Sequence, residues 1–373
     1  MEYLADTVPI QRIAISTGGG DAPGLNAVIR AVVLAALKRG WDCCGIREGF
    51  NGLLMPERYV EGGLIPLTRD RVRGITHLGG TILGTTNRGN PLHFPICYPD
   101  GRVEEVDRTD ELVRAFRLHQ IDALVSIGGD GSMTIANALA QKGLRVVGVP
   151  KTIDNDLEGT VATFGFDTAV AFATECLDRL HSTAESHNRL MVVEVMGRYA
   201  GWIALHTGIA GSADVILLPE IPYSLDKVAA KIRERDDQGR NFSIVVVAEG
   251  AKPIGGDVSV VGREVGRAEQ LGGAGERVAA ALQALTGKET RVVVLGHLLR
   301  GGSPTTSDRL LALRFGAAAV RALEEGQSAV MVALDPPIVR YVPLAEAARR
   351  MKLVPLDSDT VLTARDLGIC FGD

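Results

Sequence analysis

The sequence predicts an α/β fold with two similar three-layer α/β/α lobes and largely parallel sheets. Short apolar runs, rich in β-branched residues, recur without alternation, which is typical of strands that helices cover on both faces. Glycine clusters follow two of these runs and precede stretches in which apolar residues recur every three or four positions, as in amphipathic helices. The 373 residues, 46% of them apolar, are enough for two lobes with substantial cores.

The elements are expected in a fixed order along the chain. A strand at 12–17 leads through the glycines of 18–24 into a helix at 25–39. A strand at 122–127 leads through 128–132 into a helix at 133–142. Further strands are expected at 146–149, 190–195, 215–218, 244–248 and 292–295. The glycine-rich segment 251–275 is expected to form loops.

Composition and charge exclude several classes of protein. The 44 glycines follow no three-residue period, so a fibrous protein is excluded. The 40 basic and 45 acidic residues give a net charge of −5, which disfavours nucleic acid as a partner. Five cysteines without metal-ligand spacing indicate reduced thiols in a cytoplasm. The longest apolar stretch, 31–37, is too short to span a membrane, and the first residues form no signal pattern.

Two glycine-rich loops are suited to phosphate groups. Glycines let backbone N–H groups approach a phosphate, and the helix that follows adds the positive end of its dipole. The first loop, 18–24, matches neither standard nucleotide fingerprint, so a tight strand-to-helix turn is the alternative. The second, 128–132, carries Asp130 between glycines, where a carboxylate can hold a Mg²⁺ that bridges two phosphates. An Asp-stabilised turn is the alternative there.

The segment 150–156 carries two carboxylates, Asp154 and Asp156, two positions apart. In an extended segment both would point the same way, beside the Thr152 hydroxyl. A carboxylate that faces a substrate hydroxyl can orient it and accept its proton during phosphoryl transfer. An acidic loop without a catalytic role is the alternative, because Pro, Asn and Asp all favour loops.

Basic residues lie at or just past several predicted strand ends. They are Arg189, Arg198, Arg291, His297 and Arg300. The planar guanidinium binds two phosphate oxygens at once and stays charged. Taken singly, each arginine is equally compatible with a solvated surface position.

Six segments of the chain occur in an order that is informative. They are GGGDAPGLNAVIR (18–30), GGDGS (128–132), PKTIDND (150–156), AESHNRLMVVEVMGRYAGW (184–202), VVAEGA (246–251) and TRVVVLGHLLRGGSPTTSDR (290–309). Together they resemble the 6-phosphofructokinases, over residues 10–325. The resemblance implies phosphoryl transfer to the 1-hydroxyl of fructose 6-phosphate, the glycolytic step that gives fructose 1,6-bisphosphate. It implies an active-site cleft between a donor-binding lobe, 1–165 joined by about 299–349, and a fructose 6-phosphate lobe, 166–298 joined by about 350–373.

The resemblance also assigns roles to individual residues. Implied catalytic residues are Asp154, which takes the proton of the sugar hydroxyl, Thr152, Arg198 and Gly20. Implied donor contacts are Gly20, Arg88, Gly129, Asp130, Gly131, Ser132 and Lys151, with Asp130 as the ligand of Mg²⁺. Implied sugar contacts are Thr152, Asp154, Asp156, Arg189, Met196, Gly197, Arg198, Glu249, Arg291, His297 and Arg300. In the family, the counterparts of Arg189 and Arg291 come from a neighbouring subunit, which implies a homodimer or a homotetramer.

Two positions indicate different phosphoryl donors. Gly131 is similar to the ATP users of the family, whereas pyrophosphate users tend to carry Asp there. Lys151 is similar to the pyrophosphate users. We expect MgATP, because the absence of a carboxylate at 131 removes a direct barrier to the nucleotide, whereas a lysine attracts either donor. A reversible, pyrophosphate-dependent enzyme is the alternative. Asn87 also departs from the family pattern beside Arg88.

The sequence also bears on allosteric regulation and on whether the protein is an enzyme. Arg30 is retained at the bacterial effector site, but Leu34 and His181 stand where arginines are expected, which predicts weak or absent regulation by ADP and phosphoenolpyruvate. A non-catalytic sensor of sugar phosphates or nucleotides is the alternative from another class. A kinase for NAD or a lipid would share only GGDGS and leaves the segment 150–156 unexplained.

Overall fold

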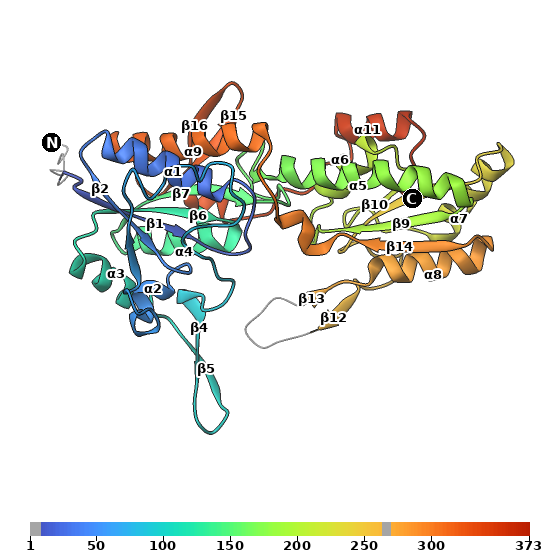
Figure 1. Ribbon diagram of the computed structural model, residues 1–373. Coiled ribbons are helices and arrows are strands. Elements are labelled where there is room, and N and C mark those ends of the chain that lie inside the picture. The colour runs from blue at the N-terminus through green and yellow to red at the C-terminus, as the bar shows by residue number, and fades with distance from the viewer. Residues whose placement is uncertain (1–8, 263–269) are drawn as a thin grey trace. The chain divides into compact units, whose positions relative to one another are not determined.

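The chain divides into two compact units with interleaved segments (Figure 1). The computed structural model describes residues 9–262 and 270–373. The first unit contains the chain to Thr152 with 157–165 and 301–350, and the second contains 153–156, 166–300 and 351–373. Residues 153–156 therefore group with the second unit, whereas the sequence analysis placed them in the first lobe.

The first unit is built on an eight-stranded sheet. Its order is β16-β15-β7-β6-β1-β2-β3, and β8 pairs with β7. The bounds are β1 Arg12–Thr17, β2 Asp42–Ile46, β3 Leu64–Pro66, β6 Ala123–Gly128, β7 Arg145–Thr152, β8 Phe164–Gly165, β15 Val330–Asp335 and β16 Ile338–Pro343. The pairs β2–β3 and β15–β16 are antiparallel, and the other pairs are parallel.

Helices cover both faces of this sheet because successive strand residues point to opposite sides. Ile13 packs in the cluster under α1 (Leu25–Leu37) and α9 (Thr306–Glu324). Its neighbour Ala14 packs in the cluster on the other face. That second face is covered by α2 Asn51–Leu54, α3 Thr109–Leu118, α4 Asp130–Gln141 and α10 Leu344–Ala347. The remaining elements of this unit are η1 Pro56–Arg58, η2 Pro91–His93 and the hairpin of β4 Phe94–Cys97 and β5 Val103–Val106.

The second unit is built on four parallel strands in the order β10-β11-β9-β14. Their bounds are β9 Leu190–Val195, β10 Val215–Leu217, β11 Ser243–Ala248 and β14 Thr290–Val294. The helices α7 Leu225–Asp237 and α8 Ala274–Thr286 pack on one face. The helices α5 Phe166–His187 and α6 Trp202–Ala210 pack against each other and against the same strands. The unit also contains η3 Gly296–Arg300, α11 Asp359–Asp366 and the short hairpin of β12 Val260–Gly262 and β13 Gln270–Leu271.

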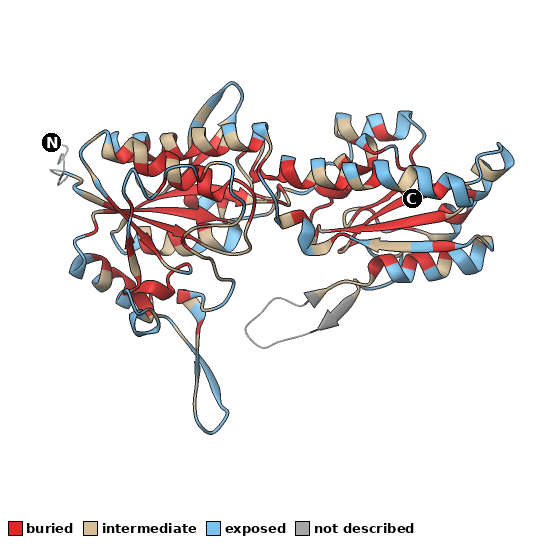
Figure 2. Cartoon of the chain, in the orientation of Figure 1, coloured by how far each residue is buried: buried red, intermediate tan, exposed pale blue. Residues whose placement is uncertain are grey.

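The predicted α/β class with largely parallel sheets is confirmed. Figure 2 shows the strands of both sheets as mostly buried, and the helices as buried on one side and exposed on the other. The two units are less alike than expected, because their sheets differ in size. Part of the predicted loop at 251–275 forms the hairpin, and 263–269 lie outside the described residues. Within the described ranges, no helix combines the length and apolar character needed to cross a bilayer.

Candidate functional site

The first candidate surface is the carboxyl edge of the first sheet, which we call the first-unit edge. It consists of residues 18–20, 128–132 and 151–152. Strands β1, β6 and β7 are parallel neighbours, with Thr17 opposite Ile127 and Gly128 opposite Pro150. The three segments that leave these strands therefore lie at one edge of the sheet. The chain goes from β1 to β2 on one side and reaches β6 on the other. Such a reversal of strand order is where open α/β sheets bind ligands.

Hydrogen bonds fix the backbone of the first glycine loop. Gly19 donates its N–H to the carbonyl of Thr86 at 3.0 Å, and the Thr85 hydroxyl donates to the carbonyl of Gly19 at 2.6 Å. The ammonium of Lys151 donates to the carbonyl of Gly20. Lys151 is 3% exposed, so its charge lies at the base of the loop rather than in solvent. A buried cation beside a glycine loop favours an anionic ligand there.

Several glycines are required by packing inside the first unit. A Cβ at Gly128 would lie 2.0 Å from the Ser132 hydroxyl oxygen, and a Cβ at Gly18 would lie 2.7 Å from it. A Cβ at Gly79 would lie 2.5 Å from the carbonyl oxygen of Gly302. Close packing is thus a further reason for glycine at 18 and 128, besides the phosphate approach or the tight turn that the sequence suggested.

The second glycine loop is shorter than the sequence indicated. The helix α4 begins at Asp130 rather than at 133, with Gly129 as its N-cap. A carboxylate in the first turn of a helix is stabilised by the helix dipole, which favours helix over loop here. Gly131 is exposed, and a Cβ there would meet nothing within 4 Å. There is therefore open space next to Gly131, and Ser132 lies in the same helical turn.

The carboxylate of Asp130 fits Mg²⁺ bound in the way that is typical of kinases. Asp130 is an exposed carboxylate. Across residues 9–262 and 270–373 no group of three His, Cys, Asp or Glu side chains could hold a metal ion by itself. Mg²⁺ commonly takes one or two carboxylates and completes its shell with water and substrate phosphates. A single carboxylate at a helix N-terminus matches that pattern.

The loop that carries Arg88 is tied to the first-unit edge. The Thr86 hydroxyl accepts the N–H of Arg88 at 3.0 Å, and Arg88 is exposed. The side-chain amide of Asn26 on α1 donates to the carbonyls of Leu78 and Gly79 and accepts the N–H of Ile82, which fixes the segment before this loop. This buried asparagine was not among the predicted site residues. Its signal is a polar residue at an apolar position of a helix.

Phe50, the residue before α2, is 8% exposed. It packs in the core cluster on the α3 and α4 face of the sheet.

The second candidate surface is the carboxyl edge of the second sheet, which we call the second-unit edge. It consists of 196–198, 249–250 and 296–300. Strand β9 lies between β11 and β14, with Val195 opposite Ala248 and Glu194 opposite Val294. The segments that follow these strands therefore lie side by side. Six of the predicted sugar contacts belong to these three segments, and one of them, His297 on η3, is exposed. The others are Met196, Gly197, Arg198, Glu249 and Arg300.

Backbone hydrogen bonds hold the segments after β9 and β11 together. Glu249 donates its N–H to the carbonyl of Val195 at 2.9 Å, and Gly250 donates to that of Gly197 at 3.1 Å. A Cβ at Gly250 would lie 2.0 Å from the carbonyl oxygen of Arg198. Gly250 is therefore needed to place Arg198 and Glu249 together, a role that the sequence analysis did not identify.

The charges of two guanidinium groups act on the Glu249 carboxyl group. Burial raises its pKa, the charges of Arg198 and Arg300 lower it in part, and Glu194 raises it. The Arg198 guanidinium also lies 5.7 Å from the centroid of the Tyr199 ring. A carboxylate between cations can accept hydroxyl hydrogen bonds while the cations bind phosphate oxygens. This chemistry suits a phosphorylated polyol.

The segment after β7 is not extended as far as Asp156, so the extended arrangement considered from the spacing of Asp154 and Asp156 does not occur. Strand β7 extends through Lys151 and Thr152, but 153–154 form a turn and Asn155 has a φ of 53°. Asp154 and Asp156 are therefore not on one face of an extended strand. Asn tolerates this left-handed conformation better than most residues do, because its side chain can hydrogen-bond locally. Both carboxylates are half-buried.

Two predicted sugar contacts lie at the opposite edge of the second sheet. Arg189 precedes β9, and Arg291 is opposite Met191 near its start. Because β9 has six residues, this amino edge lies about 20 Å from the second-unit edge. The Glu289 carboxylate bridges both arginines, at 2.9 Å from Nη2 of Arg189 and closer still to Nη2 of Arg291. The structure of one chain thus separates these arginines from the other sugar contacts of its second unit.

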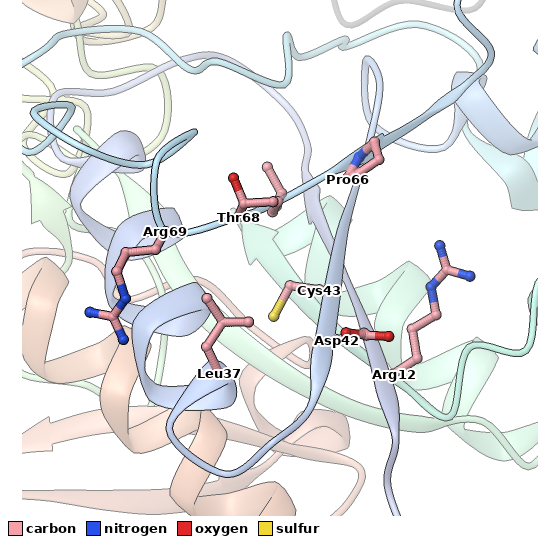
Figure 3. A pocket seen from close by; sticks show the side chains of 8 residues that line it. Arg12, Leu37, Asp42, Cys43, Pro66, Thr68 and Arg69 are labelled. Atoms are coloured by element: carbon pink, nitrogen blue, oxygen red, sulfur yellow. The ribbon is translucent and has the colours of Figure 1, made fainter.

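A cavity of about 380 Å³ lies at the amino ends of β1 and β2 in the first unit. Figure 3 shows Arg12 and Arg69 at opposite sides of it, with Cys43 between them. Burial raises the pKa of Cys43 to about 12, so its thiol is protonated and unreactive at neutral pH. The cavity contains no residue of the predicted site.

Known proteins resemble this chain over nearly its full length. A family model described as Phosphofructokinase matches residues 12–323. The chain belongs to the phosphofructokinase family. An ATP-dependent 6-phosphofructokinase of Chloroflexus aurantiacus is 54% identical, over 97% of this chain and 98% of its own length. ATP-dependent 6-phosphofructokinase 2 of Clostridium perfringens is 48% identical, over 98% of this chain and 99% of its own length. The family resemblance stated from the motifs is confirmed.

Solved structures of phosphofructokinases share the fold. The Pichia pastoris enzyme in its T-state is 32% identical, with a TM-score of 0.77 over 98% of this chain, which spans 37% of that chain's length. A pyrophosphate-dependent phosphofructokinase of Nitrosospira multiformis is 24% identical, with a TM-score of 0.79 over 97% of this chain and 93% of that one. At that identity the second likeness extends to the fold alone.

Proposed function

We propose that this chain is an ATP-dependent 6-phosphofructokinase, which transfers a phosphoryl group from MgATP to the 1-hydroxyl of D-fructose 6-phosphate. The observation that carries the proposal is the second-unit edge, where Arg198, Glu249 and Arg300 gather at three strand ends. The names of the relatives, which match over 97% and 98% of this chain, support ATP as the donor.

The first-unit edge is the proposed donor site. Gly20, Gly129, Gly131 and Ser132 border the donor phosphates, Lys151 adds a positive charge, and Arg88 reaches from the neighbouring loop. Asp130 would hold Mg²⁺ together with the phosphates. When bound, the ion neutralises phosphate charge and orients the donor for transfer.

Asp154 is the proposed base. Its carboxylate accepts the proton of the sugar 1-hydroxyl as that oxygen attacks the phosphorus atom. Thr152 and Asp156 flank it and orient the hydroxyl. Arg198 neutralises charge on the group in transfer. Because the protein forms no covalent bond in this reaction, positioning and charge neutralisation determine the rate.

The sugar phosphate is bound by two copies of the chain in this proposal. Met196, Gly197, Glu249, His297 and Arg300 belong to the second-unit edge of one copy. Arg189 and Arg291 lie at the far edge of the same sheet, so they serve the site of a neighbouring copy in a homodimer or homotetramer. The first unit is thus the donor lobe and the second the sugar lobe. The free thiols among the described cysteines support a cytoplasmic location.

Pyrophosphate is the second candidate donor, because Lys151 is similar to the lysine of the pyrophosphate users and its buried ammonium lies at the glycine loop. That charge by itself would attract either donor. The open space at Gly131 favours the larger nucleotide.

A coupled assay with fructose 6-phosphate and Mg²⁺ compares the two donors. We expect kcat/KM for ATP to exceed that for pyrophosphate by at least about 100-fold, which corresponds to about 2.7 kcal/mol in the transition state. Turnover with pyrophosphate alone would reassign the donor. Binding of fructose 6-phosphate without turnover of either donor would indicate a sensor.

A further inference from the structure

We propose that Lys352 is a positioning residue that holds the catalytic turn 153–156 in place, with Trp202 as its support. The inference rests on the proposed function, because it assigns the turn's carboxylate, Asp154, to proton transfer. Lys352 lies on the C-terminal segment 351–373, which groups with the second unit, as the turn does.

Lys352 contacts the turn through both its backbone and its side chain. Its N–H donates to the carbonyl of Asp156 at 2.8 Å, and its ammonium donates to Oδ1 of Asn155 at 2.9 Å. Asn155 is 5% exposed and has the left-handed φ of 53°, so the bend of the chain after Asp154 occurs at this residue. One lysine therefore fixes two consecutive residues directly after the proposed base.

Trp202 holds Lys352 from the other side. The indole Nε1 donates to the carbonyl of Lys352 at 2.9 Å, and the ammonium lies 5.6 Å from the centroid of the Trp202 ring. This distance is within the range of a cation–π interaction. Trp202 is the first residue of α6, so a regular element anchors the contact. The ammonium is thus placed by both the indole ring and the Asn155 amide.

A buried carboxylate fixes the backbone next to this contact. Glu220 accepts the N–H of Gly201 at 3.0 Å and that of Val354 at 2.9 Å. Burial raises the pKa of Glu220, and these two bonds lower it in part. The residue before Trp202 and the segment after Lys352 are therefore joined through one side chain. The C-terminal segment cannot shift relative to α6 without breaking these bonds.

This arrangement has a catalytic consequence because Asp154 sits on a short turn rather than within a strand or helix. Proton transfer requires the base within hydrogen-bond reach of the hydroxyl, and a misplacement of 1 Å can cost about 100-fold in rate. The Lys352 contacts restrain the turn on the side of Asp154 that strand β7 does not hold. Loss of Lys352 should therefore act on the reaction rate through Asp154.

The test measures steady-state kinetics of Lys352→Met with ATP and fructose 6-phosphate, beside Lys231→Met as the matched control. Lys231 pairs with Glu234 on α7 and touches neither candidate edge. We expect Lys352→Met to lower kcat about 10- to 100-fold, with the KM for ATP within about twofold, because positioning acts in the transition state. The control should keep its kcat. A kcat of Lys352→Met within twofold of the parent overturns the proposal.

A double variant separates positioning from a merely structural role. In the Asp154→Asn background, Lys352→Met should lower the residual kcat by less than about threefold, because groups that act as a unit are non-additive. If the losses of kcat caused by Lys352→Met and by Asp154→Asn multiply in the double variant, the proposal is overturned. If Lys352→Met does not fold, Trp202→Phe carries the same test, with an expected loss of about 3- to 10-fold from the missing indole donor. Absence of turnover in the parent protein would instead refute the proposed function.

Discussion

The first-unit edge and the second-unit edge present different chemistry at equivalent places in their sheets. The first consists mostly of glycine backbone, with the buried ammonium of Lys151 and the exposed carboxylate of Asp130. The second carries arginine, glutamate and histidine side chains. Backbone donors suit phosphate chains, which differ little from one nucleotide to another. Side chains at fixed strand ends distinguish the hydroxyls and the phosphate of a particular sugar. We therefore expect added side chains to impair ligand binding at the first-unit edge. At the second-unit edge, we expect removed side chains to impair it.

The largest effect is expected at the turn that follows β7. Asp154→Asn keeps the size of the side chain but removes its ability to accept a proton at neutral pH. We expect kcat to fall by at least about 1,000-fold with a small change in the KM for fructose 6-phosphate, because the base acts mainly in the transition state. Steady-state kinetics with both substrates varied checks this. Near-normal turnover would refute the assignment of the base.

A smaller effect is expected from removing a side chain at the amino edge of the second sheet. Arg291→Ala removes one guanidinium from the pair that Glu289 bridges. We expect the KM for fructose 6-phosphate to rise about 10- to 100-fold with little change in kcat, as for a lost charge-assisted contact to phosphate.

Mixing the two variants tests whether Arg291 serves a neighbouring copy. Hybrid oligomers of Arg291→Ala and Asp154→Asn contain sites with an intact base from one chain and an intact arginine from the other. Activity should therefore recover on mixing and subunit exchange, while each variant alone stays impaired. No recovery in oligomers shown to be hybrid would place Arg291 outside the neighbouring site.

At the first-unit edge, an added side chain should weaken donor binding. Gly131→Asp fills the open space beside α4 with a carboxylate, which repels the donor phosphates. We expect the KM for ATP to rise about 10-fold or more, and Gly131→Asn to have a smaller effect because it adds size without charge. Equal effects of the two variants would show that size alone matters. An unchanged KM for ATP in Gly131→Asp would show that the donor does not bind next to residue 131.

The smallest effect is expected from effectors. The His181 ring is hydrogen-bonded at 2.8 Å to the carbonyl of Gly211 and packs edge-on to Phe242, so it is occupied by contacts within the unit. Leu34 supplies no charge. Titration with phosphoenolpyruvate should therefore shift the fructose 6-phosphate saturation curve by less than about twofold, which is less than the usual range of allosteric coupling. A large sigmoidal shift would contradict this.

The sequence was sufficient for the family, the α/β class and the strands that lead to both edges, because apolar runs and glycine clusters are local signals. It was insufficient for the shape of the turn at 153–156. The spacing of Asp154 and Asp156 suggested an extended segment, but the left-handed Asn155 bends the chain between them. Dihedral angles at single residues depend on tertiary contacts, which a two-residue spacing does not encode.

Contacts between distant parts of the chain were equally hidden. Lys352 meets a residue 197 positions earlier, and no periodicity marks such a pair. Gly250 looked like one glycine among many, yet it is required by the carbonyl of Arg198 rather than by a turn. Likewise, the glycines at 18 and 128 make room for the Ser132 hydroxyl. A sequence shows where glycine occurs, whereas the structure shows which neighbour requires it.

The interleaving of the two units has a consequence for synthesis on the ribosome. The first unit begins with β1 but takes its helix α9, its strand β15 and its edge strand β16 from residues 301–350. The apolar face of α1 therefore stays uncovered by α9 until most of the chain has been made. The second unit likewise waits for the last residues of the chain, because 351–373 belong to it. A product that stops before residue 301 contains neither unit whole, and one that stops just after residue 350 still lacks part of the second unit. Such products leave core residues exposed for chaperones and proteases to recognise.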